Sequence, residues 1–286
     1  MSTNFVFFGS SEISVTALEV LKEKGFLPTL IITKPDAPQG RGLVVTPSPV
    51  KVWGEKNNIE IFTPTSLKSP EVLSQLSKVN CPVAVLVSYG KIIPESIINL
   101  FPKGILNLHP SLLPLLRGPA PFEYSILNLS KDQIGVSIML LDKGMDSGDV
   151  LAQKKVELAD WPISHSALYE ILANEGSLLL VETLEKYLDG EISPTPQDHS
   201  RATFSKMIEK KDGEITLDGD SYQNYLKFLA FTPWPGIFFF VEKGEKKIRV
   251  KVKDGKYEES IFTPLSVIPE GKKEMSYSDF LKGYSI

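Results

Sequence analysis

The sequence predicts an α/β protein: a mainly parallel sheet with helices on both faces, followed by a small, mainly β region. Apolar strands alternate with amphipathic helices through the first half of the chain, and the apolar run Val83–Ser88 is continuous, as in strands covered on both faces. Beyond residue 205 short β-rich runs replace the helical periodicity. Two domains are therefore expected, 1–205 and 206–286.

Each element of the first domain has its own signal. The expected strands are, in chain order, Asn4–Phe8, Leu30–Thr33, Val83–Ser88, Gly104–His109 and Ile134–Leu141. Ser48-Pro49 and Ser69-Pro70 each place an N-cap serine before a proline at the first helical position, and a long helix is expected over Ser166–Leu188. This succession is typical of a Rossmann-like parallel sheet, whose chemistry lies outside the carboxyl ends of its strands.

The second domain begins after a polar segment, Glu191–Ser200, which we interpret as a linker or domain edge because it carries two prolines. A helix is expected around Tyr222–Leu229 and a short terminal helix at Ser278–Lys282. The β-rich runs are Ile237–Val241, Ile248–Val252 and Ile261–Val267, with a hairpin turn signal at Asp254-Gly255.

Composition excludes several classes of protein. Of the 286 residues, 42% are hydrophobic and 23% charged, which is ordinary for a globular protein. The net charge of −4 excludes a uniformly basic nucleic-acid binder but not a local basic face. No apolar run approaches the roughly 18 residues that cross a bilayer. The single cysteine, Cys81, excludes a disulfide within the chain, as is typical of a cytoplasmic protein. We also expect no membrane partner, and a monomer.

The first candidate for chemistry is Asn107-Leu108-His109, at the end of an expected inner strand. Strand geometry sends Asn107 and His109 to the same side. An amide and an imidazole that converge there can bind a developing oxyanion and manage a proton. The alternative is that both side chains only tie down the following turn.

Two loops follow this strand and the next one. Ser111–Pro121 is proline-rich and apolar, and could form a wall for a flat aromatic ligand. Asp142–Asp149 carries three acidic residues and follows the strand Ile134–Leu141, so that a carboxylate could reach His109 if the two strands are neighbours. An acidic turn in solvent is the alternative.

The sequence disfavours a metal ion and a dinucleotide as cofactors. The three histidines, His109, His165 and His199, are far apart, and no Cys-x-x-Cys pair exists, so we expect no metal; His165 and His199 are expected at the surface. Gly9-Ser10-Ser11 is too poor in glycine to hold a dinucleotide.

Taken together, these motifs resemble the folate-dependent formyltransferase superfamily. The resemblance rests on Asn107-Leu108-His109, on the loop Ser111–Gly118 and on Gly144–Asp149, although Leu115 and Leu116 replace the basic and aromatic residues usual in that loop. It implies Asn107, His109 and Asp146 as the catalytic residues and 10-formyltetrahydrofolate as co-substrate. It also implies a pterin pocket lined by Tyr89, Ile92, Ser111, Leu112, Leu113, Pro114, Leu140 and Asp142.

The segment Thr33–Lys51 resembles the inserted loop of the superfamily branch that acts on initiator methionyl-tRNA. The resemblance covers nearly the whole chain and implies a second domain that is OB-like but shortened. It implies formylation of the methionyl amine on the tRNA, giving N-formylmethionyl-tRNA for translation initiation. A sugar-nucleotide amine as acceptor, or a catalytically silent RNA-binding module, are the alternatives.

Cations in two places suit an RNA partner. Lys247–Lys253 alternates cations with aliphatics, so that a strand would carry a basic stripe on one face, and a solvated edge strand is the alternative. The expected tRNA contacts are Lys34, Arg41, Lys51, Lys247, Arg249, Lys251 and Lys253.

Overall fold

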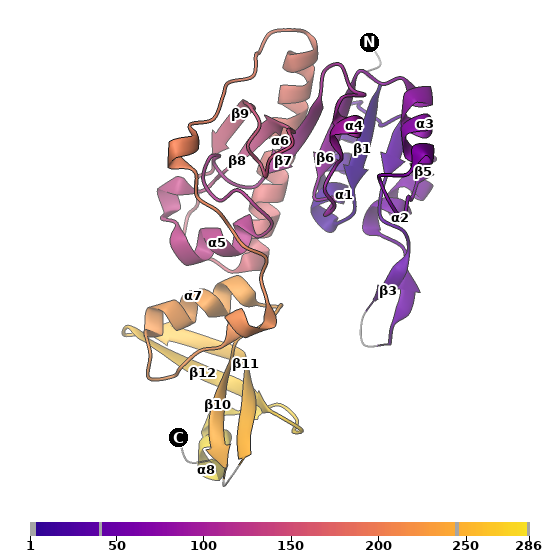
Figure 1. Cartoon of the computed structure of the whole chain (residues 1–286). Helices are drawn as coiled ribbons and strands as arrows, with labels where there is room; N and C mark the ends of the chain where they lie inside the picture. Colours follow the sequence, from indigo (N-terminus) through magenta and orange to yellow (C-terminus); the bar gives the residue numbers. More distant parts are fainter. Residues whose placement is uncertain (1–3, 40–41, 244–245, 285–286) are drawn as a thin grey trace. The chain divides into compact units, whose positions relative to one another are not determined.

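A computed structural model describes residues 4–39, 42–243 and 246–284, and Arg41 lies outside these residues. The chain forms two compact units (Figure 1). The first comprises Met1–Pro119, Asp132–Glu157 and Tyr169–Phe204, and the second comprises Ala120–Lys131, Leu158–Leu168 and Ser205–Ile286.

The first unit is built on a seven-stranded sheet of order β5-β2-β1-β6-β7-β8-β9. Its strands are β1 (Phe5–Gly9), β2 (Leu30–Ile32), β5 (Glu60–Phe62), β6 (Val83–Val87), β7 (Ile105–His109), β8 (Gly135–Leu140) and β9 (Val150–Lys155). The five strands from β5 to β7 are parallel to one another. The mainly parallel sheet expected from the sequence is confirmed.

The last two strands are joined by antiparallel pairing, so that β8 alone runs against the other six strands. β8 pairs antiparallel with β7, and β9 antiparallel with β8. Leu140, at the end of β8, therefore lies opposite Leu106, while His109 lies opposite Ser137. The end of β8 is thus remote from the end of β7, and the loop after β8 has to return along the sheet to reach His109.

Helices cover both faces of this sheet. They are α1 (Glu12–Glu23), α2 (Pro49–Lys56), α3 (Pro70–Val79), α4 (Glu95–Ile98) and α6 (His165–Leu188). Val72 of α3 and Ile97 of α4 belong to one core cluster with Val6, Phe8 and Ile105. On the opposite face a Cβ added to Gly176 of α6 would lie 3.0 Å from the side chain of Leu108, so this helix packs directly on β7.

The helix starts follow the sequence signals. The Ser48 side chain accepts a hydrogen bond from the backbone N–H of Lys51, with Pro49 at the first helical position. Pro70 occupies the same position after Ser69. The long helix expected from Ser166 begins at His165 and ends at Leu188.

The segment expected to be an inserted loop contains a β-hairpin of β3 (Ala37–Gln39) and β4 (Val44–Thr46). Leu43, Val44 and Val45 are 71%, 66% and 63% exposed. The hairpin thus presents aliphatic side chains to solvent at one end of the first unit.

The polar segment Glu191–Ser200 is more than a linker, because it is bonded into the first unit. Thr195 and Val150 exchange two backbone hydrogen bonds of 2.8 Å, which place the segment along the outer edge of β9. Gln197 is 7% exposed. Polar, proline-containing composition predicts an irregular path but not whether the segment is bonded to the sheet.

The second unit carries an antiparallel sheet of order β10-β11-β12-β13. Its strands are β10 (Phe238–Lys243), β11 (Lys246–Glu258), β12 (Ile261–Pro269) and β13 (Met275–Ser276), and its helices are α5 (Pro121–Asn128), α7 (Ser221–Phe231) and α8 (Tyr277–Gly283). Four strands pair among the described residues, whereas an OB barrel has five. The mainly β region is confirmed, in a shortened form.

The prediction of a hairpin turn at Asp254-Gly255 was wrong. β11 continues through both residues, with shifts of register on either side of Asp254. A Cβ at Gly255 would lie 2.8 Å from the ring of Phe262, so this glycine permits a bulge packed against an aromatic side chain. The turn lies at Glu259 and Ser260, whose φ angles of 50° and 65° meet the requirement of a tight hairpin turn.

No helix within the described ranges is both long enough and apolar enough to span a membrane.

Candidate active site

The site is built around the carboxyl end of β7. Asn107 and His109 project from the same face of β7 as Ile105, since side chains alternate along a strand. They are 6% and 4% exposed. An amide and an imidazole therefore lie side by side, almost out of solvent.

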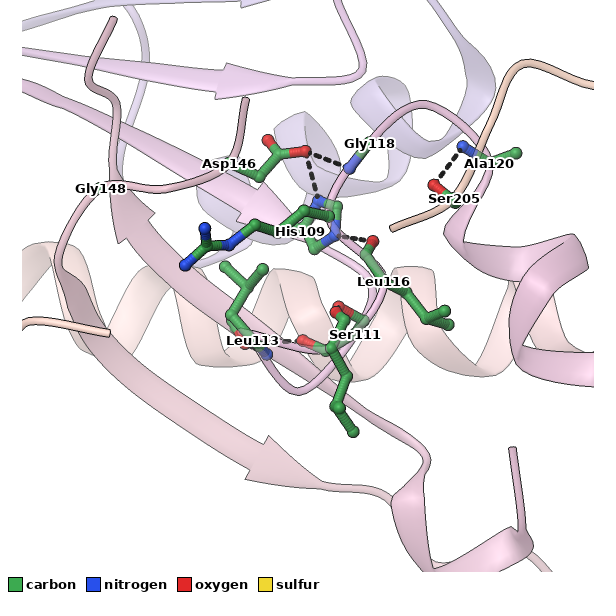
Figure 2. A network of polar contacts seen from close by, with 12 residues as sticks. His109, Ser111, Leu113, Leu116, Gly118, Ala120, Asp146, Gly148 and Ser205 are labelled. Atoms are coloured by element: carbon green, nitrogen blue, oxygen red, sulfur yellow. Dashed lines mark hydrogen bonds and ion pairs between the residues drawn. The ribbon is translucent and has the colours of Figure 1, made fainter. Parts of the chain in front are cut away.

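Both nitrogens of the His109 ring face an oxygen atom, and one of them is hydrogen-bonded. Nε2 lies 3.0 Å from the carbonyl oxygen of Leu116, which can only accept, so Nε2 carries a proton. Nδ1 lies 3.8 Å from the Oδ2 atom of Asp146 (Figure 2). In the neutral ring Nδ1 is thus the basic nitrogen, and on protonation its new N–H would face a carboxylate.

Asp146 is held by the loop that follows β7. Its Oδ2 atom accepts a hydrogen bond of 2.7 Å from the backbone N–H of Gly118, as Figure 2 shows. The Asp146 backbone has a φ of 49°, a conformation that non-glycine residues rarely adopt. A Cβ at Gly148 would lie 1.9 Å from the carbonyl oxygen of Leu140, so the returning loop passes very close to β8.

The Asn107 amide has no hydrogen-bond partner among the residues that the structure describes, nor is it among the fully enclosed polar groups. Its donors are therefore available to a ligand at the end of β7. This differs from the alternative in which Asn107 ties down the following turn.

The loop after β7 is cross-linked internally. Ser111 Oγ donates to the carbonyl of Leu115, and the backbone N–H of Leu113 donates to Ser137 Oγ at 3.0 Å. Gln153 Nε2 donates to the carbonyl of Leu113 at 2.7 Å. Leu112, Pro114 and Leu115 are half-buried, whereas Ser111, Leu113 and Leu116 are buried. A fixed wall with a few accessible apolar side chains results.

The other residues expected at the pterin pocket lie in different surroundings. Tyr89 is fully buried, with its ring edge-on to Phe8 in the core, and burial raises the pKa of its hydroxyl to about 12. Ile92 is 93% exposed. Asp142 accepts hydrogen bonds from Gly144 N and Ser147 Oγ inside its own loop. Leu140 lies at the end of β8 and donates its backbone N–H to Asp149.

The expected tRNA contacts of the first unit differ in charge environment. Lys51 forms a 2.8 Å ion pair with Asp36, and this hydrogen bond raises the pKa of Lys51. Lys34 has no ion pair among the described residues and lines a hollow of about 290 Å³ together with Ser10, Ser48 and Ser88. The hollow lies beyond the carboxyl ends of β1, β2 and β6, where open α/β sheets bind ligands.

In the second unit the expected alternation along β11 is present. Val250 and Val252 are buried, while Lys247 is exposed and Arg249 half-buried. The Arg249 guanidinium lies 3.6 Å from the centroid of the Phe238 ring, and the Lys247 ammonium 4.4 Å from that of Phe240. The register passes from Val252 to Asp254, so Lys253 is an unpaired bulge residue and the stripe is interrupted there.

The two remaining histidines were expected at the surface, but both contact other side chains. His165 is partly buried and lies 3.4 Å from a carboxylate oxygen of Glu123. His199 is exposed, but its Nδ1 atom lies 3.0 Å from Nη2 of Arg117. Within the described ranges no group of three His, Cys, Asp or Glu side chains is placed to hold a metal ion.

Sequence reasoning missed Gln197, whose side chain joins buried Arg117 to the loop of Asp146. The only signal was an amide side chain in a polar segment, which does not distinguish a bonded residue from a solvated one.

Comparison with known proteins identifies the family of this chain. The formyl transferase family model matches residues 3–184. A methionyl-tRNA formyltransferase of Chloroflexus aurantiacus is 42% identical over 236 residues, covering 82% of this chain and 75% of the relative. One from Caldicellulosiruptor saccharolyticus is 34% identical over 312 aligned residues, covering 99% of this chain and 97% of the relative.

Among solved structures, that of HypX from Aquifex aeolicus in complex with tetrahydrofolic acid has a TM-score of 0.63 at 14% identity, covering 97% of this chain and 46% of that one. This likeness shows a shared fold. The mainly parallel sheet and the matching family model define an α/β group-transfer enzyme. The chain belongs to the formyl transferase family, and its relatives at 34% and 42% identity bear the name methionyl-tRNA formyltransferase.

Proposed function

We propose that this protein transfers the formyl group of 10-formyltetrahydrofolate to the amino group of initiator methionyl-tRNA, giving N-formylmethionyl-tRNA for translation initiation. The observation that carries the proposal is the free Asn107 amide beside the His109–Asp146 pair at the end of β7. The matching relatives named methionyl-tRNA formyltransferase support the choice of acceptor.

The residues around this site fit a folate. Leu112, Pro114 and Leu115 offer half-buried apolar surface to a flat ring, on a loop made rigid by its internal hydrogen bonds. Tyr89 and Asp142 would contribute through backbone atoms rather than side chains, since the first is enclosed in the core and the second is bonded within its own loop.

The chemistry follows from the three polar side chains. The neutral amine attacks the formyl carbon, and the carbonyl oxygen takes up negative charge. The Asn107 amide donates to that oxygen, and a preorganised donor of this kind contributes about 10²–10³ in rate. His109 Nδ1 accepts the proton lost by the amine, and the Asp146 carboxylate balances the imidazolium charge. The bond between the formyl carbon and the folate nitrogen then breaks, and that nitrogen takes the proton back.

The spacing of the pair is compatible with this role. The 3.8 Å separation of Nδ1 and Oδ2 is longer than a hydrogen bond, and such contacts shorten when the substrate is bound. Gly118 N–H keeps the carboxylate in place in the free protein.

The acceptor tRNA would be held by cations on both units. In the first unit Lys34, without an opposing carboxylate, is better placed for a phosphate than Lys51, which Asp36 neutralises. Arg41 belongs to the same proposal but lies outside the described residues. In the second unit Lys247, Arg249 and Lys251 share a strand face with Phe238 and Phe240, a combination suited to a phosphate backbone and stacked bases.

We further propose that residues 1–205 act as the catalytic domain and 206–286 as the tRNA-binding domain of a cytoplasmic monomer. Light scattering at micromolar concentration tests the monomer, and a mass of twice 31.7 kDa would contradict it.

One incubation tests the central proposal. The protein is mixed with 10-formyltetrahydrofolate and charged initiator tRNA. The amino acid is then released from the tRNA, and its mass is measured by mass spectrometry to detect an added formyl group. Parallel reactions contain an amino-sugar nucleotide, no acceptor, or the Asn107→Ala variant. Formylation of the sugar amine alone, or of no acceptor at all, would refute the proposal.

A further inference from the structure

We infer that Gln197 is a positioning residue for the reaction: its side-chain amide, oriented by Arg117, holds the loop that presents Asp146 to His109. The inference rests on the proposed function. It assigns a role in turnover to a segment whose sequence predicts a linker or a domain edge.

Gln197 uses the whole hydrogen-bonding capacity of its amide. Oε1 accepts from Nε and Nη2 of Arg117 at 3.1 and 2.7 Å. Nε2 donates to the carbonyl oxygens of Asp146 and Gly148 at 2.9 and 2.7 Å. Because an amide accepts two bonds and donates two, no donor or acceptor is left over.

Arg117 determines which way this amide points. A guanidinium can only donate, so Oε1 has to face it, and the NH₂ group then has to face the two carbonyls. Arg117 is 4% exposed and is tied to the chain beyond α6 by its backbone N–H, which donates to Thr203 O at 2.9 Å. The orientation is thus imposed by a buried cation.

The loop needs such support at this point. Asp146 has a left-handed φ of 49°, and its carboxylate receives one hydrogen bond, from Gly118. Gln197 holds the carbonyl of Asp146 itself and that of the residue two positions on, which fixes the backbone from which the carboxylate projects. Misplacement of a reacting group by about 1 Å can cost about 10²-fold in rate.

The sharpest test is Gln197→Glu. A carboxylate still accepts from Arg117, so the buried cation keeps its partner, but it cannot donate to the two carbonyls and repels them. We expect kcat to fall by about 10–100-fold while KM for 10-formyltetrahydrofolate changes by less than about threefold. In the free protein the His109 ring signals in a proton–nitrogen NMR spectrum should also move, since the facing carboxylate is displaced.

Gln153→Glu is the matched control. Gln153 Nε2 also donates to a loop carbonyl, that of Leu113 at 2.7 Å, and to Ser137 Oγ at 2.9 Å, but on the side of the folate loop. The same substitution there should raise KM for 10-formyltetrahydrofolate and leave both kcat and the His109 signals nearly unchanged.

The pair separates positioning from general loss of structure. Equal losses of kcat in both variants, or a Gln197→Glu variant that keeps wild-type kcat and His109 signals, would overturn the inference. If the wild-type protein formylates no acceptor, the proposed function fails, and the NMR comparison of the two variants still decides whether Gln197 positions Asp146.

Discussion

Replacement of Tyr89 by Phe should stabilise the protein. The Tyr89 side chain is fully enclosed, and its hydroxyl has no hydrogen-bond partner among the residues the structure describes. An enclosed polar group without a partner costs about 1–3 kcal/mol, and phenylalanine keeps the ring while it removes that group. We therefore expect the Tyr89→Phe variant to gain about 1–2 kcal/mol, which raises Tm by a few degrees, about 2–4 °C for each kcal/mol.

The effect should grow at alkaline pH. Burial raises the pKa of Tyr89 from 10.0 to about 12, so the folded state holds the phenol proton more tightly than the unfolded state does. The proton therefore stabilises the folded state fully below pH 10, and this contribution is lost as pH rises from 10 to 12. Two pKa units correspond to about 2–3 kcal/mol of free energy of unfolding, as an upper bound. The wild type should lose this stability between pH 10 and pH 12, whereas the Tyr89→Phe variant should not.

Urea unfolding of both proteins at pH 8, 10 and 11, followed by circular dichroism, measures these differences. Tyr169→Phe is the matched control, because Tyr169 Oη accepts a 2.7 Å hydrogen bond from the Ile13 N–H and its loss should destabilise. A Tyr89→Phe variant less stable than wild type by about 1 kcal/mol would show that the hydroxyl is bonded, and would refute the reasoning.

Three further substitutions test the site and its surroundings. Asn107→Ala should lower kcat by about 10²–10³ with little change in the KM of the folate, and steady-state rates that stay within about twofold would exclude Asn107 as oxyanion donor. Gly148→Ala would place a Cβ 1.9 Å from the Leu140 carbonyl oxygen, so both Tm and kcat should fall; an unchanged Tm in calorimetry would contradict the close approach. Lys247→Ala should weaken tRNA binding equally for different tRNAs and reduce the slope of log affinity against log salt by about 1, and an unchanged slope would remove Lys247 from the interface.

Hydrophobic pattern and capping signals predicted most elements of the fold. β6 and α1 were recognisable because a continuous apolar run and a helical spacing of apolar residues are local features of the sequence. The direction of β8 was not, since period-2 patterning is the same for a parallel and an antiparallel strand. Gly255 was misread because glycine serves a bulge as readily as a turn. The true turn has Glu259 and Ser260 at positive φ, where tight hairpin turns usually have glycine, asparagine or aspartate.

The sequence predicts which residues could form the candidate site, but not how all of them come together. Asn107 and His109 share a face for a purely local reason, so their proximity followed from spacing. How Asp146 comes near them depends on the return of the loop after β8 and on Gln197, which is 51 residues further along the chain. Such contacts are set by tertiary structure, and a single sequence carries no local trace of them.

The paired backbone groups of Val150 and Thr195 have a second consequence. β9 is the last strand of its sheet, and an uncovered last strand is a template for self-association with another molecule. Thr195 occupies the N–H and C=O of Val150, while Lys154 and Lys155 place charge at the other end of the strand. The segment that delivers Gln197 to the loop of Asp146 therefore also helps to keep the sheet from recruiting a foreign strand.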